Sequence, residues 1–77
     1  MARLPAVTGP EAIKAFARIG FLEHRIAGSH HILKKPGHKF LLTVPVPGRK
    51  TLPPGTLRAL IRGAGISVEE FVELLRK

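Results

Sequence analysis

The chain has 77 residues and a formal net charge of +8 at pH 7, a size that predicts one small domain, residues 1–77, with a core of marginal stability. It has no cysteine, which excludes disulfides, thiolate metal sites and cysteine nucleophiles and agrees with a reducing compartment. No apolar run approaches the roughly 18 residues of a membrane span, and residues 1–10 do not resemble a signal peptide, so we expect a soluble, cytoplasmic protein.

The first predicted element is a helix. Thr8 and Glu11 have the spacing of a capping box, in which each residue satisfies a backbone N–H of the other. The apolar residues that follow fall mostly on one helical side until Gly20. The pattern predicts a helix over about Gly9–Ile19.

Three short runs of strand-forming residues come next. They are Phe21–Ile26, His30–Lys35 and Lys39–Val44. Residues 27–29 form a connection of hairpin length that contains a glycine, and Pro36 and Gly37 end the second run. Pro45 and Pro47 stop the third run because proline has no N–H to donate. We expect an antiparallel meander of three strands.

Two helices complete the predicted order. Pro53, Pro54, Gly55 and Thr56 open the first of them, and its apolar residues recur at helical spacing until Gly65. Ser67 and Glu70 form a second capping box before a short amphipathic helix. The fold class that these elements favour is α+β, with the helices packed on one face of the sheet.

The segment from His24 to Val68 holds the chemically informative residues. It contains eight Lys or Arg, all four histidines and neither Asp nor Glu. Within it, His30 and His31 follow the turn residues Gly28 and Ser29 and lie at the start of a predicted strand. Adjacent side chains of a strand point to opposite faces, so at most one of the two imidazoles faces a bound substrate. An imidazole among unopposed cations suits a polyanion whose reaction moves a proton near neutral pH. RNA fits that description.

Metal and serine chemistry are disfavoured by the same segment. His24 and His38 lie in separate runs without a carboxylate or cysteine to complete a metal shell, and Mg²⁺ would lack oxygen ligands. Hydrolysis of RNA needs no metal or other cofactor, since its 2′-OH is an internal nucleophile. Ser29 lacks a carboxylate to orient a base, so a serine hydrolase is excluded. The alternative for each histidine is an ordinary surface residue with one hydrogen bond.

Basic residues on the second and third strands and the following loop are the predicted phosphate contacts, expected close to His30. With Ser29 of the turn, the predicted RNA-binding residues are Lys34, Lys35, Lys39, Arg49 and Lys50. The alternative is a solvated basic face. All four phenylalanines occupy predicted core positions and the chain lacks Trp and Tyr, which disfavours RNA binding by stacking on exposed aromatics.

An ordered set of motifs along nearly the whole chain resembles a known family. The motifs are Gly20-Phe21, Gly28-Ser29-His30-His31, Leu42-Thr43-Val44-Pro45, Gly48-Arg49-Lys50, Gly55-Thr56-Leu57-Arg58 with Ile61, and Ala64-Gly65-Ile66-Ser67 with Phe71. They are similar to HicA-type (YcfA-like) toxins, small mRNA interferases of bacterial and archaeal toxin–antitoxin pairs.

The resemblance implies a fold like the double-stranded RNA-binding domain, a catalytic His30, metal-independent cleavage of mRNA and a HicB-type antitoxin as protein partner. The family motif constrains the residue at the position of His31 less strictly than the residue at the position of His30. Many members carry a histidine two residues after the proline of the Val-Pro pair, where this chain has Pro47, which implies weaker activity or reliance on His30 with lysines. Two alternatives stay open: a non-catalytic RNA-binding module on the same fold, and a domain that binds an acidic protein.

Overall fold

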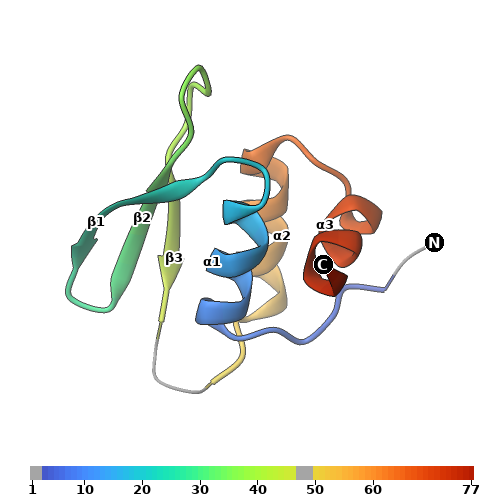
Figure 1. The fold of residues 1–77 in the computed structure, drawn as a ribbon. Coiled ribbons are helices and arrows are strands. Elements are labelled where there is room, and N and C mark those ends of the chain that lie inside the picture. Colours follow the sequence, from blue (N-terminus) through green and yellow to red (C-terminus); the bar gives the residue numbers. More distant parts are fainter. Residues whose placement is uncertain (1–2, 47–49) are drawn as a thin grey trace.

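Three helices and three strands follow one another in the predicted order in a computed structural model, which describes residues 3–46 and 50–77 (Figure 1). The elements are α1 (Gly9–Ala17), β1 (Leu22–Ala27), β2 (His30–Lys34), β3 (Leu42–Pro45), α2 (Pro54–Ala64) and α3 (Val68–Arg76). The expected α+β class is confirmed. None of the helices in the described ranges is long and apolar enough to cross a membrane.

Both predicted capping boxes are present. The Thr8 hydroxyl accepts from the Glu11 N–H while the Glu11 carboxylate accepts from the Thr8 N–H at 2.8 Å, and Ser67 and Glu70 repeat the arrangement at α3. Helix α1 ends at Ala17, two residues before the predicted end. The chain turns here because the Phe16 carbonyl accepts from the N–H groups of residues 19 and 21.

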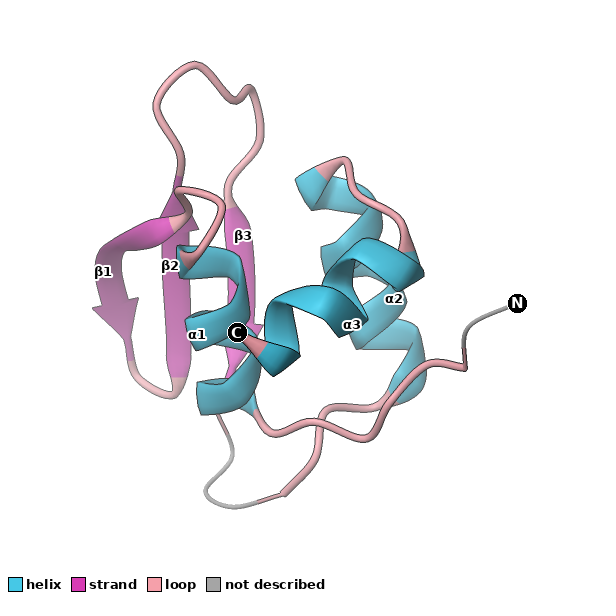
Figure 2. Cartoon of the chain, turned by 45° about the vertical axis from the view of Figure 1, so that its right-hand side comes forward, coloured by secondary structure: helices cyan, strands magenta, loops and turns pink. Residues whose placement is uncertain are grey.

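The strands form an antiparallel sheet in the order β1, β2, β3, and the helices cover one of its faces (Figure 2). Leu33 of β2 and its partner Leu42 of β3 are buried on the helix side. The third strand begins at Leu42 rather than Lys39, because the pairing with β2 ends there. Phe40 lies before the strand and is 59% exposed, so the prediction that it belongs to the core is wrong.

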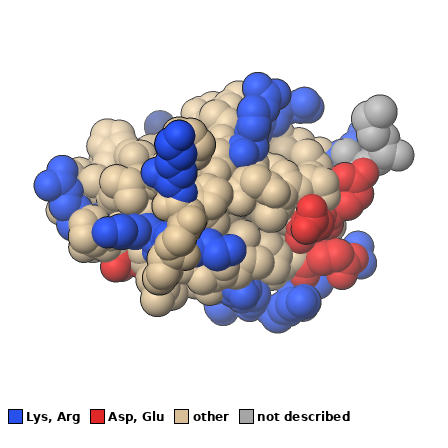
Figure 3. Space-filling view, turned by 90° about the horizontal axis from the view of Figure 1, so that it is seen from above, with Lys and Arg blue, Asp and Glu red and all other residues tan. Residues whose placement is uncertain are grey.

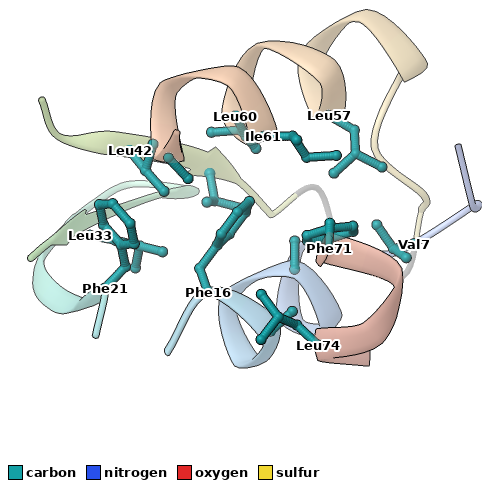
Figure 4. Close-up of a cluster of buried hydrophobic side chains, with 14 of the residues drawn as sticks. Val7, Phe16, Phe21, Leu33, Leu42, Leu57, Leu60, Ile61, Phe71 and Leu74 are labelled. Atoms are coloured by element: carbon teal, nitrogen blue, oxygen red, sulfur yellow. The ribbon is translucent and has the colours of Figure 1, made fainter. Parts of the chain in front are cut away.

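The core lies between the sheet and the helices (Figure 4). The rings of Phe16, Phe21 and Phe71 are fully buried, with centroids 5.2 Å apart for the Phe16–Phe71 pair and 6.3 Å apart for the Phe16–Phe21 pair. Strand β1 contributes nothing to this core, since all six of its residues are exposed. The sheet therefore has a well-anchored side at β3 and an exposed edge strand at β1.

A β-bulge in β1 changes which side chains share a face. Leu22 pairs with Lys34 and Glu23 with Leu33, whereas the next pair is Arg25 with Ile32, so one residue of β1 is unpaired. Without the bulge, Glu23 would lie opposite Lys34. The extra residue moves Glu23 to the helix side and brings Leu22 to the open face, the face of the sheet away from the helices.

Candidate functional site

A two-residue turn delivers His30 to the end of the central strand. Ala27 pairs with His30 across the turn, and Gly28 has φ +60°, as the first position of a type II′ hairpin turn requires. The Ser29 carbonyl accepts from the Val46 N–H at 2.7 Å, which ties the turn to the end of β3. His30 is exposed, although its strand is hydrogen-bonded on both sides.

The sheet register places the two neighbouring histidines on opposite faces. His31 pairs with the buried Val44 and therefore lies on the helix side. His30 shares the open face with Ile32 and Lys34, two and four residues further along β2. Of these two histidines, only His30 is thus available to a molecule that binds across the open face.

His31 has a carboxylate partner that the sequence did not predict. Its Nδ1 lies 2.5 Å from Oε1 of Glu23, and the two side chains are 23% and 44% exposed. Glu23 lies one residue before the stretch without acidic residues, so the expectation that the histidines have no carboxylate nearby is wrong for His31. The bulge causes this contact, because it turns Glu23 to the face of His31.

Arg25 is a second residue that sequence reasoning missed. It pairs with Ile32 and therefore lies on the open face, one diagonal position from His30. Counting back through the hairpin from the pair of Ala27 and His30 would have found it. Lys34 lies on the same face, about 13 Å from His30 by the rise of a strand. Arg25 and Lys34 are the cations that the register assigns to the face of His30.

The other predicted RNA contacts do not all lie at the end of the sheet that holds His30. Lys35 and Lys39 lie at the opposite end, where the Lys35 Nζ is 5.6 Å from the Phe21 ring centroid and the Lys39 Nζ is 5.9 Å from the Phe40 ring centroid. Lys50 is exposed and precedes Thr51, which pairs with Thr8, the residue just before α1. Arg49 lies outside the described residues.

The start of α1 holds the strand end beside His30. A Cβ atom on Gly9 would lie 2.7 Å from the Pro45 carbonyl oxygen and 2.9 Å from Cγ2 of Val46. The absence of a side chain therefore permits the close approach of α1 to β3. Since Pro45 pairs with His30, the position of this histidine depends on how closely α1 packs against the end of β3.

Residues 9–66 match the family model of the HicA toxin of bacterial toxin–antitoxin systems. The chain belongs to the HicA toxin family. The match runs from the first residue of α1 to the second residue after α2 and so includes the whole sheet and His30. The resemblance read from the motifs is confirmed. A comparison with curated protein sequences gives no match.

The charges of this HicA-family chain are unevenly distributed. Figure 3 shows blue Lys and Arg side chains over much of the surface, whereas most of the red acidic ones in this view gather on the α3 side. Helix α3 carries the exposed Glu69, Glu70 and Glu73. Among the described Lys and Arg residues, Arg76 alone is in a salt bridge, with Glu73 at 3.6 Å. Most cations are therefore available to an anionic partner.

The described residues of this HicA-family chain contain no group of three His or Glu side chains close enough to hold a metal ion. Glu23, the acidic residue of the sheet, is in contact with His31. The chemistry that these residues can perform is therefore proton transfer by an imidazole and stabilisation of negative charge by nearby cations.

Proposed function

We propose that this chain is a metal-independent endoribonuclease toxin that cleaves mRNA, with His30 as its catalytic residue. The observation that supports this most is the position of an exposed imidazole on the open sheet face, at the end of the central strand. Arg25 and Lys34 lie on the same face, whereas the register places the acidic Glu23 on the helix side. Such a face attracts a polyanion, and the His30 imidazole can move a proton there.

In the proposed reaction, the ribose 2′-oxygen attacks the neighbouring phosphorus as its proton is removed. A bond forms between the 2′-oxygen and phosphorus, and the bond from phosphorus to the 5′-oxygen breaks. His30 either accepts the 2′-OH proton or donates the proton that the leaving 5′-oxygen needs, solvent water performs the other transfer, and Arg25 stabilises the charge on phosphate. The products are a 2′,3′-cyclic phosphate and a 5′-hydroxyl, and the cyclic ester then hydrolyses to a 3′-phosphate.

Further proposed RNA contacts lie beyond this centre. Ser29 lies in the turn before His30, Lys50 follows the end of β3 in the chain, and Lys34, Lys35 and Lys39 extend the basic surface towards the far end of the sheet. Arg49, the remaining proposed contact, lies outside the described residues. These residues position the phosphate backbone without selecting a sequence. Pro47 replaces the second histidine of many family members, and it lies outside the described residues. The reaction therefore relies on His30 and the surrounding cations.

The first experiment incubates the purified protein with a messenger RNA in excess EDTA. Cleavage should persist, and the 3′ ends should be 2′,3′-cyclic phosphates or 3′-phosphates, because the internal nucleophile requires no metal-bound water. Complete inhibition by EDTA that added Mg²⁺ restores would refute the metal-independent mechanism.

The proposed partner is a HicB-type antitoxin that covers the face of His30, and the proposed site of action is the cytoplasm. Expression of the chain alone should arrest growth, and co-expression of its HicB-type antitoxin should restore growth. A non-catalytic RNA-binding module is the second candidate, favoured by Pro47 in place of the family histidine. That candidate becomes the better interpretation if the chain binds RNA but never cuts it.

A further inference from the structure

A hollow lies at the β1 edge of the open face, at the end away from His30. Its volume is about 550 Å³, and its lining residues are Leu22, Glu23, His24, Lys34, Pro36 and Gly37. Leu22 and Lys34 pair across β1 and β2, so both side chains project on the open face. The distance along β2 from His30 to Lys34 is about 13 Å. The hollow therefore belongs to the same surface as the proposed catalytic residue.

The bulge of β1 creates this arrangement. It brings Leu22 opposite Lys34 and leaves His24 as the additional residue of the strand. Leu22 is 60% exposed, whereas its neighbour Phe21 is fully buried. Bulges recur beside functional sites, where they change the direction of a side chain. Here the bulge presents an apolar side chain to solvent beside a cation.

The opposite wall of the hollow is held in place by His38. Pro36 and Gly37 form a turn after β2, and the His38 ring that follows donates from Nε2 to the Gly63 carbonyl at 2.8 Å. The same ring packs edge-on against Phe21, with centroids 4.9 Å apart. The residue after this wall is therefore attached both to the core and to the end of α2, which favours a preformed hollow.

The chemistry of the lining suits one nucleotide of single-stranded RNA. Leu22 offers an apolar surface to the flat face of a base, the His24 imidazole can stack on it, and the Lys34 ammonium can bind its phosphate. Glu23 also lines the hollow, and its carboxylate is in contact with His31 Nδ1. We infer that this hollow is a subsite for an unpaired nucleotide that lies a few nucleotides from the bond to be cut. The inference rests on the proposed function.

The first test measures binding in the His30→Ala protein, which should not cut the RNA during the experiment. The probe is a fluorescent single-stranded oligoribonucleotide. Leu22→Ala should weaken binding about fivefold to tenfold through lost apolar contact, with an unchanged salt dependence. Lys34→Gln should reduce the log–log salt slope by about 0.7, because one phosphate contact is lost.

Matched controls exist on the same elements. Ile26 also lies on β1, is 56% exposed and does not line the hollow, so Ile26→Ala should bind the oligoribonucleotide like the parent. Lys14 is an exposed lysine on α1, on the other side of the sheet, and Lys14→Gln should keep the salt slope. Equal losses of oligoribonucleotide affinity for Leu22→Ala and Ile26→Ala would overturn the proposal of a nucleotide subsite.

The second test maps cleavage sites with active protein. Leu22→Ala should relax the base preference at one fixed position relative to the cut, whereas Ile26→Ala should keep the parental pattern. If the parent cuts RNA and Leu22→Ala binds and cuts identically, the subsite is overturned and the proposed function stands. If the parent never cuts RNA but Leu22→Ala loses binding, catalysis is refuted and the hollow stands as a nucleotide site. Unchanged RNA binding by Leu22→Ala with loss of antitoxin inhibition would instead assign the hollow to the protein partner.

Discussion

His30 and His31 are adjacent imidazoles with different surroundings. His30 is exposed on the open face of the sheet, and His31 lies on the helix side against Glu23. A free imidazole can exchange a proton with a bound substrate, whereas a carboxylate partner fixes the ring that it contacts. The two residues should therefore respond differently to substitution.

His30→Ala should reduce the rate of RNA cleavage by about 10² to 10⁴, the usual contribution of a general acid or base, while RNA affinity stays close to the parent. His31→Ala should instead lower stability by about 1 kcal/mol through the lost contact with Glu23 and keep most of the cleavage activity. Cleavage rates, RNA affinity and melting temperature of both variants check the assignment. A folded His30→Ala protein that cuts RNA at the parental rate would refute it.

At the scale of elements, the position of His30 depends on the contact between α1 and β3. Gly9→Ala should destabilise the protein by about 1 to 3 kcal/mol, because the added Cβ meets the Pro45 carbonyl and Val46 at distances that the backbone must relieve. Gly55 is the matched control, since a Cβ there meets nothing within 4 Å. Gly55→Ala in the first turn of α2 should leave the melting temperature unchanged or raise it. Equal melting temperatures for the two variants would show that the contact does not constrain the fold.

The elements also show what could be predicted from sequence. The helices were placed by local signals, such as the capping box of Thr8 and Glu11 and the left-handed Gly65 at the end of α2. The bulge that redirects Glu23 depends on pairing between strands and has no local signal. The residue type of Phe40 predicts a core position, but the strand pairing that would bury it ends at Leu42. The surroundings of His31 and the hollow beside Leu22 therefore required the structure.

At the scale of the whole molecule, charge dominates the expected behaviour. The net charge is +8, and several of the few acidic residues lie on α3, away from the sheet. If about four or five phosphates are neutralised on a single strand, the log–log dependence of RNA affinity on salt should have a slope near −3. Fluorescence anisotropy between low and moderate salt measures this slope. A flat response would show that the basic surface does not bind RNA.

The exposed strand β1 has a consequence for how such a protein can diversify. None of its six residues is buried, so most substitutions there change folding free energy very little. The same strand supplies Arg25 beside His30 and Leu22 beside the hollow. Drift or selection can therefore remodel what this surface recognises while the core between α1, α2 and β3 stays the same. Divergence among related toxins should concentrate in β1, and a library randomised at its six positions should yield folded proteins with altered target preference.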